Sequence, residues 1–171
     1  MTLDALWREL GIDPATLQQR GVRMVRQARQ LTPVGLGTDG RDKLLTPAAA
    51  RAWLAMREQA AADGVVLLLV SAFRSVDYQA ALLRARLARG ESIEQVLRIN
   101  AAPGCSEHHS GRAVDIGTPG CGGLDAAFDL TEAFDWLRRN AARHGYRMSY
   151  PPGNPQGYAY EPWHWCHRPR R

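Results

Sequence analysis

The chain alternates between segments with helical and with strand-like spacing of apolar residues. Each helical segment follows a residue that commonly caps a helix, namely Asp13, Thr46, Ser75, Ser92 or Thr131. Residues 65–73 instead form the continuous apolar run VVLLLVSAF, which is typical of a buried strand. Shorter strand-like segments lie at 112–116, 146–150 and 160–166, the last two joined by the turn PPGNPQG.

This order of elements predicts an α+β fold in which helices flank a small antiparallel sheet. The chain has 171 residues, a length typical of one domain. We expect residues 1–35 to form a helical N-terminal extension packed on the main domain of residues 36–171. Nothing in the sequence indicates an oligomer, so we expect a monomer.

Composition excludes several classes of protein. Apolar residues make up 45% of the chain and mean hydropathy is −0.35, a balance typical of globular proteins. No apolar stretch reaches the ~20 residues of a membrane span, and the N-terminus lacks the apolar core of a secretory signal. The net charge of +5 alone, without a recognition motif, does not indicate nucleic-acid binding.

The three cysteines leave their redox state open. Cys105 and Cys121 flank the segment richest in polar motifs, so a disulfide between them is one interpretation. An odd number of cysteines and the absence of a CxxC motif favour free thiols equally well.

Residues able to bind a metal concentrate in two segments. The first, SEHHSGRAVDIG at 106–117, contains His108, His109 and Asp115; the second, YEPWHWCH at 160–167, contains Glu161, His164 and His167. A catalytic zinc needs three such ligands and one open position. Spacing alone leaves the site undecided, since residues seven apart in a regular strand point to opposite faces. Gly111 lets the chain turn between His108 and Asp115.

Three motifs together resemble a known family. SEHHSGRAVD fits the pattern SxHxxGxAxD, EPWHW fits ExxH, and SAFRSVDYQ at 71–79 is similar to (S/G)(Y/F)RSxxxQ. All three are motifs of the VanY-type D-alanyl-D-alanine carboxypeptidases and occur here in that family's order, over roughly residues 40–167. The family is part of a group that includes lysostaphin-like peptidases and the hedgehog signalling domain.

The resemblance implies a role for each matching residue. It implies that Zn²⁺ binds to His108, Asp115 and His164, that Glu161 is the catalytic base, and that Arg74 stabilises the oxyanion. Ser106 matches a substrate-binding serine, and Gln79 a positioning group. His109 and His167 match no ligand, and we interpret them as solvated or as lying just outside the metal ligands. Phe73 replaces a tyrosine that often precedes the arginine.

The function implied is removal of the terminal D-Ala from peptidoglycan stem peptides or precursors ending in D-Ala-D-Ala. Two alternatives stay open: an endopeptidase cutting L-Ala-D-Glu or a cross-bridge, and an inactive zinc-bearing binding module. Glu161 and Arg74 argue against the binding module, which needs neither residue. The substrate implies a periplasmic or wall-associated protein if a signal was removed, and a cytoplasmic one otherwise.

Overall fold

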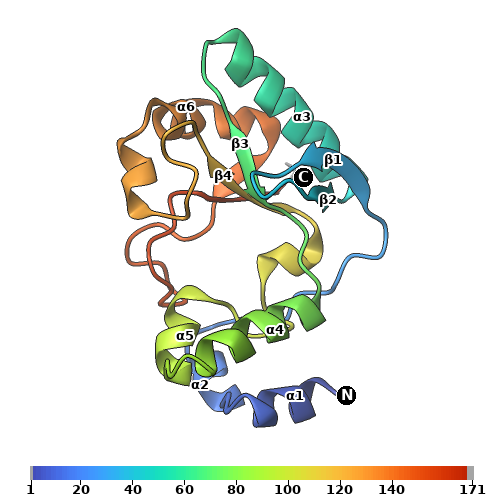
Figure 1. Cartoon of the computed structure of the whole chain (residues 1–171), viewed down its shortest axis with the longest axis vertical. Helices are drawn as coiled ribbons and strands as arrows, with labels where there is room; N and C mark the ends of the chain where they lie inside the picture. The colour runs from blue at the N-terminus through green and yellow to red at the C-terminus, as the bar shows by residue number, and fades with distance from the viewer. Residues whose placement is uncertain (1, 169–171) are drawn as a thin grey trace.

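A four-stranded antiparallel sheet lies between two groups of helices in the computed structural model, which describes residues 2–168 (Figure 1). The strand order is β3-β4-β6-β5. The strands are β3 (Leu68–Ser71), β4 (Ala113–Gly117), β5 (Tyr146–Met148) and β6 (His164–His167). The expected α+β class, with a small antiparallel sheet flanked by helices, is therefore confirmed.

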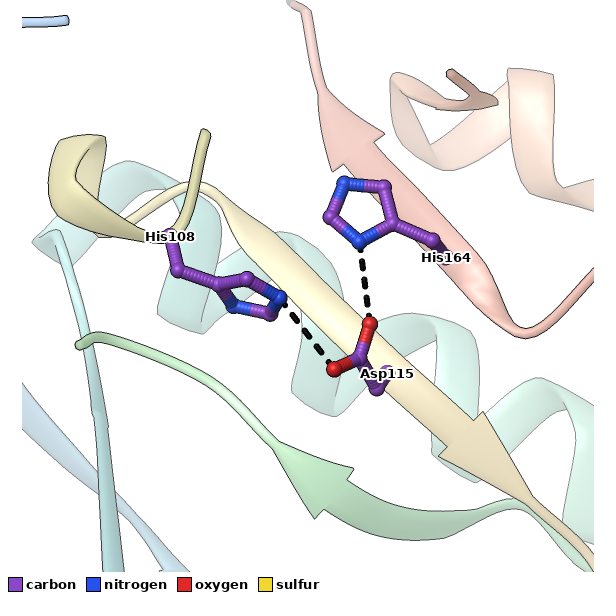
Figure 2. Close-up of side chains that lie close together, drawn as sticks. All are labelled: His108, Asp115 and His164. Carbon is purple, nitrogen blue, oxygen red and sulfur yellow. Dashed lines mark hydrogen bonds and ion pairs between the residues drawn. The ribbon is translucent and has the colours of Figure 1, made fainter. Parts of the chain in front are cut away.

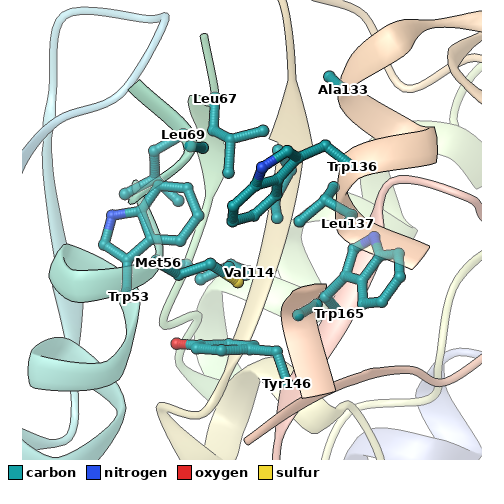
Figure 3. Close-up of a cluster of buried hydrophobic side chains, with 14 of the residues drawn as sticks. Trp53, Met56, Leu67, Leu69, Val114, Ala133, Trp136, Leu137, Tyr146 and Trp165 are labelled. Atoms are coloured by element: carbon teal, nitrogen blue, oxygen red, sulfur yellow. The ribbon is translucent and has the colours of Figure 1, made fainter. Parts of the chain in front are cut away.

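The first helical group packs on one face of this sheet. It comprises α3 (Pro47–Ala62), α6 (Glu132–Asn140) and the 3-10 helices η2 (Ala126–Leu130) and η3 (Ala141–His144). The main core lies between these helices and the strands and includes Trp53, Met56, Leu69, Val114, Trp136, Leu137, Tyr146 and Trp165 (Figure 3). Burial of large aromatic and aliphatic side chains supplies most of the stabilisation of such a layer.

The second helical group forms a separate core. It contains α1 (Leu3–Glu9), α2 (Pro14–Gln19), α4 (Val76–Leu87) and α5 (Ile93–Ile99), at the lower end of the molecule in Figure 1. Leu6, Trp7 and Leu17 of the N-terminal segment are buried in one cluster with Leu83 and Val96. The 3-10 helix η1 (Glu107–Ser110) precedes β4. The division at residue 35 stays a prediction.

The helix starts follow the capping residues of the sequence. Asp13, Ser75, Ser92 and Thr131 each accept a backbone hydrogen bond at the start of a helix, and Ser92 and Gln95 form the expected capping box. Thr46 precedes α3 without a side-chain bond. Capping groups satisfy the free N–H groups of the first turn locally, which is why short-range sequence signals locate them.

The strands are shorter than predicted. The apolar run 65–73 contributes only four residues to β3, although Val65 and Leu67 are also buried in the core. The run therefore indicates burial, whereas strand length depends on the five-residue partner β4. The predicted strand 160–166 begins only at His164, because the segment before it, which contains Pro162, is a turn.

A two-stranded hairpin was not predicted. It consists of β1 (Thr32–Leu36) and β2 (Asp42–Leu45), which pair antiparallel with an irregular register. The hairpin is attached to the chain around β3, because Thr38 N–H donates to the Leu69 carbonyl and Phe73 N–H to that of Leu44. Among residues 2–168, no helix has the length and apolar content that a membrane span requires.

Candidate active site

His108, Asp115 and His164 meet at one point beside the sheet (Figure 2). The Nε2 atom of His108 lies 3.2 Å from Oδ2 of Asp115, and Nδ1 of His164 lies 2.9 Å from Oδ1. Each residue offers one ligand atom, and the three atoms lie within 4.8 Å of one another. The three side chains could therefore hold one metal ion, and we call them the metal cluster.

Strand register and one glycine bring the cluster together. Asp115 and His164 are direct partners in the antiparallel ladder of β4 and β6. His108 reaches the same face from η1, because Gly111 adopts a left-handed φ of 63° between η1 and β4. A Cβ atom at Gly111 would approach the backbone nitrogen of Thr46 to 3.2 Å, so the turn also requires a small residue.

Hydrogen bonds on the outer side of each imidazole orient the rings. The Nδ1 atom of His108 lies 2.6 Å from the Ala72 carbonyl oxygen, which can only accept a hydrogen bond. The Nε2 atom of His164 lies 3.1 Å from Oε2 of Glu107. Each outer nitrogen therefore bonds to an oxygen, and the inner nitrogen faces Asp115. This arrangement is typical of histidines that bind metals.

Glu107 holds His164 within a small polar network. Its Oε2 atom also accepts a hydrogen bond from Ser149 Oγ at 2.5 Å, and its Oε1 atom pairs with the Arg168 guanidinium at 2.7 Å. Burial opposes ionisation of this carboxyl, but the bonds from His164 and Ser149 and the charge of Arg168 hold its pKa at about 2. Glu107 is therefore a fixed anion beside one cluster histidine.

Charges within the cluster also fix the state of Asp115 and His164. Both side chains are buried, with exposed fractions of 2% and 3%. Burial alone raises the pKa of Asp115, but the two histidines lower it below its usual range. Burial lowers the pKa of His164, yet the carboxylates of Asp115 and Glu107 raise it to about 10. Without a metal, His164 is consequently a cation in the cluster.

Glu161 lies beside the cluster without belonging to it. Its Oε2 atom is 3.9 Å from Nδ1 of His164, and it precedes β6 in the turn that contains Pro162. Burial, opposed by His164 and aided by Asp115, raises the pKa of Glu161 to about 7. A carboxyl with this pKa can exchange a proton at neutral pH, as a general base must.

Arg74 is held close to the carboxylate of Asp115. One guanidinium nitrogen donates to Gln79 Oε1 at 2.9 Å, while the other donates to Ser71 Oγ at 3.2 Å and lies 3.8 Å from Oδ2 of Asp115. Gln79 is fully buried, and its amide donates in turn to the Ala101 carbonyl. The guanidinium is thus fixed by its neighbours, Gln79 among them.

Six of the seven predicted site residues line a single cavity of about 520 Å³. The seventh, Gln79, does not line it. The cavity lies between the sheet and α4 with the segment after α5. Ser106 is part of its wall, and its exposed fraction is 4%. Lys43 of the hairpin and Arg86 of α4 also line it, so the cavity contains cationic side chains besides Arg74.

The interpretation of His109 and His167 as solvated is wrong, since both are buried. His109 bonds to the Arg74 carbonyl through Nδ1 and accepts a hydrogen bond from Gly104 N–H at Nε2. It therefore supports the backbone of Arg74, just outside the metal cluster. His167 packs against the ring of Tyr146, with ring centroids 5.3 Å apart.

The tryptophans beside His164 and the three cysteines are placed by the packing of the core. Trp165 is buried in the core, whereas Trp163 packs on the core and also lines the cavity. Cys105, Cys121 and Cys166 are free thiols, which excludes the disulfide interpretation for this structure.

Sequence reasoning did not single out four residues of the site. Glu107 directly precedes His108, and this neighbouring position was the one sequence signal that could have indicated its role in the site. Ser71 contacts Arg74, and the ring of Tyr150 packs on His164 with centroids 4.8 Å apart. Tyr158 lines the cavity together with Tyr150. The last two lie in an irregular loop, where periodicity carries no information about contacts.

Similarity to known proteins identifies the class. The model of the VanY D-alanyl-D-alanine carboxypeptidase family matches residues 42–170. The chain belongs to this family of peptidases. A D-alanyl-D-alanine carboxypeptidase of Enterococcus faecalis is 30% identical over 118 residues, which are 63% of this chain and 42% of that protein.

Solved structures share the fold. The structure of the LD-carboxypeptidase LdcB superposes with a TM-score of 0.74 and 28% identity, covering 82% of this chain and 69% of LdcB. A mutant of the vancomycin-resistance D,D-pentapeptidase VanY, solved with Zn(II), has a TM-score of 0.64 and 24% identity. Coverage there is 86% of this chain and 88% of the other.

The chain spans less than half the length of its curated relatives. Besides the Enterococcus protein, the Bacillus subtilis protein YodJ is 35% identical over 120 residues, which are 68% of this chain and 43% of YodJ. The similarity thus concerns the domain that carries the cavity.

Proposed function

We propose that this protein is a zinc-dependent D,D-carboxypeptidase that removes the terminal D-Ala from peptidoglycan stem peptides or precursors. The observation that carries the proposal is one cavity in which a His-Asp-His cluster, a carboxyl with a pKa of about 7 and a fixed guanidinium lie together. Membership of the VanY family supports the substrate class.

The donor set of the cluster fits zinc. Two imidazole nitrogens and one carboxylate oxygen are a ligand set that catalytic zinc sites use, with a fourth position left for water or substrate. The outer hydrogen bonds to Ala72 and Glu107 direct the inner ring nitrogens to a common point. A bound Zn²⁺ supplies a Lewis acid that lowers the pKa of coordinated water from ~15.7 to ~7 and polarises a carbonyl group. The VanY mutant structure, which contains Zn(II), is consistent with this assignment.

Glu161 carries the proton through the reaction. Its carboxylate takes a proton from the attacking water and then delivers it to the nitrogen of the departing D-Ala, so the group is regenerated in each cycle. Its buried position next to the cluster explains why the pKa lies near neutrality. In the metal-free protein this carboxyl therefore exchanges its proton near pH 7.

Arg74 stabilises the negative charge that develops on the scissile carbonyl oxygen. Gln79 and Ser71 fix the guanidinium before substrate binds, so that little reorganisation accompanies the reaction. Lys43 also lines the cavity, where its ammonium pairs with Asp39 at 2.8 Å. Ser106 offers a hydroxyl at the cavity wall.

An L,D-carboxypeptidase is the second candidate, because LdcB has the same fold at 28% identity. The two activities differ in the residue that precedes the terminal D-Ala. A D,D-enzyme cuts between two D-alanines, whereas an L,D-enzyme cuts after an L-residue. The chemistry described for Glu161 and Arg74 serves both.

The test is hydrolysis by zinc-loaded protein of a pentapeptide and a tetrapeptide from the same stem. Release of D-Ala from the pentapeptide supports the proposal, and release from the tetrapeptide alone supports the L,D-activity. Release of L-Ala together with a fragment that begins at D-Glu would assign the protein to the endopeptidases. Binding of both peptides without any cleavage would identify a binding module. Removal of zinc with a chelator and its restoration provide the control.

A further inference from the structure

The hydroxyl of Tyr158 is a buried polar group without a partner. Within residues 2–168, only this oxygen and the indole nitrogen of Trp53 are buried side-chain donors or acceptors that form no hydrogen bond. Buried polar groups in folded proteins are nearly always bonded, so an exception calls for an explanation. Trp53 lies in the main core, whereas Tyr158 lines the cavity that contains the metal cluster.

Aromatic contacts connect Tyr158 to the metal cluster. Its ring meets that of Tyr150 edge-on, with centroids 5.0 Å apart, and Tyr150 packs in turn on His164 at 4.8 Å. Tyr150 and Tyr158 therefore form one wall of the cavity that also contains Glu161 and Arg74.

The surrounding structure fixes the ring of Tyr158 and leaves its hydroxyl unused. The guanidinium of Arg20 lies 4.7 Å from the ring centroid, a cation–π distance. Arg20 is held by the carbonyls of Gln156 and Leu97, at 2.7 and 3.1 Å. The Asn154 side chain bonds to both the N–H and the carbonyl of Tyr158. Side chain and backbone are thus placed without a contribution from the phenol oxygen.

This phenol is suited to donating a hydrogen bond. Burial, partly opposed by Arg20, raises the pKa of Tyr158 to about 12, so the hydroxyl keeps its proton at neutral pH. Peptide substrates offer carbonyl and carboxylate oxygens as acceptors. A hydrogen bond from a desolvated donor to such an acceptor stabilises the complex more than one from a donor that must first lose a bond to water.

We infer that the Tyr158 hydroxyl is a substrate-binding group that donates a hydrogen bond to a carbonyl or carboxylate oxygen of the peptide. Arg20 acts as its positioning residue. The N-terminal segment therefore contributes to the active site through α2 and its C-terminal cap, besides packing on α4 and α5. The inference rests on the proposed peptidase function and assigns a part of the cavity that the sequence motifs do not cover.

Tyr158→Phe tests the inference, because it removes only the hydroxyl. We expect kcat/KM for acetyl-Lys-D-Ala-D-Ala to fall about 10-fold, the usual effect of one lost hydrogen bond. Zinc content should be unchanged, and the unfolding midpoint unchanged or higher, since no bond is lost in the free protein. Tyr160→Phe, at a position outside the cavity lining, is the control for activity and should leave kcat/KM and zinc content unchanged.

A purely structural role predicts a different result. If Tyr158→Phe lowers the unfolding midpoint together with activity, the hydroxyl has a partner in the free protein and the inference fails. It also fails if kcat/KM stays within twofold of the wild-type value. Repeating the assay with a peptide amidated at its C-terminus identifies the acceptor. A penalty that disappears indicates the terminal carboxylate, and one that persists indicates a backbone carbonyl.

Arg20 provides an independent arm. Arg20→Ala should lower kcat/KM in the wild-type background and have a much smaller effect in Tyr158→Phe, because it acts through that hydroxyl. Arg20→Lys keeps the cation over the ring and should restore part of the activity. Equal effects of Arg20→Ala in both backgrounds would show that Arg20 does not act through Tyr158.

Failure of the proposed function has a separate signature. If wild-type protein with zinc cleaves no stem peptide, the peptidase assignment fails while the binding role of Tyr158 can still be measured. Titration calorimetry with acetyl-Lys-D-Ala-D-Ala then compares wild-type protein with Tyr158→Phe. Weaker binding by the variant supports the inference, and equal affinity overturns it.

Discussion

His164 and Asp115 are partners in the ladder of β4 and β6, and Nδ1 of one lies 2.9 Å from Oδ1 of the other. In the proposed zinc site, the same nitrogen is a ligand atom. In the metal-free protein a proton occupies it, because Asp115 and Glu107 outweigh burial and raise the pKa of His164 to about 10. Metal binding must displace this proton.

This proton predicts how pH affects metal-free protein. The pKa of His164 is higher in the folded protein, about 10, than its model value of 6.5. Its stabilising contribution is therefore complete below pH 6.5 and lost as pH rises through 10. Denaturant unfolding of chelator-treated protein should show a falling midpoint between pH 7 and 9.5. Zinc-loaded protein should show a smaller fall, and equal slopes would contradict the assignment.

Glu161→Gln should abolish turnover without loss of zinc. The amide keeps the shape of the side chain but accepts no proton, and loss of a general base typically costs 10²–10⁴ in rate, on the order of several kcal/mol of barrier. The measurement is kcat beside metal content by atomic absorption. Glu132→Gln, on an exposed position of α6, is the matched control. Zinc loss in Glu161→Gln would instead make Glu161 a ligand.

His108→Ala and Asp115→Asn should lose zinc and activity together. Each removes one of three ligand atoms of the cluster, and Asp115→Asn also leaves His164 without its anionic partner. Equilibrium dialysis with zinc gives the affinity. Wild-type affinity in both variants would place the metal elsewhere.

Glu107→Ala should weaken zinc binding about 10–100-fold, as is usual when the partner of a metal-binding histidine is removed. Glu107→Gln keeps an oxygen that can bond to Nε2 of His164 and should show a smaller effect. Glu94→Ala, an exposed carboxyl at the start of α5, provides the control. Unchanged affinity in Glu107→Ala would show that the ring of His164 is held by packing alone.

Gln79→Ala should lower kcat without changing zinc content, because it releases one side of the Arg74 guanidinium. Arg74→Ala removes the charge itself, and we expect a loss of about 10²–10³ in kcat, typical of one oxyanion donor. The smaller effect of Gln79→Ala should disappear in the Arg74→Ala background. Additive losses would indicate separate roles.

Features set by local contacts could be predicted from the sequence, whereas those set by long-range contacts could not. Capping residues such as Ser75 and Thr131 located the helix starts, because their bonds lie within one turn of the chain. The hairpin of β1 and β2 was not predicted, because its stability depends on attachment to Leu69 and Phe73 as well as on its own sequence pattern. The burial of His109 was not predicted either, because its ring bonds to the Arg74 carbonyl of a distant segment.

For the site, the sequence by itself determined which residue types are present and, through three family motifs, which of them belong together. His108, Asp115, His164, Glu161 and Arg74 do lie in one cavity, as the motifs imply. Only the tertiary structure decided how each is held: Glu107 behind His164, Gln79 beside Arg74, and Arg20 on the ring of Tyr158. These contacts join segments far apart in the chain or at irregular spacing. Their geometry, which sets ring orientation and pKa, exists only once the sheet and the helices have packed.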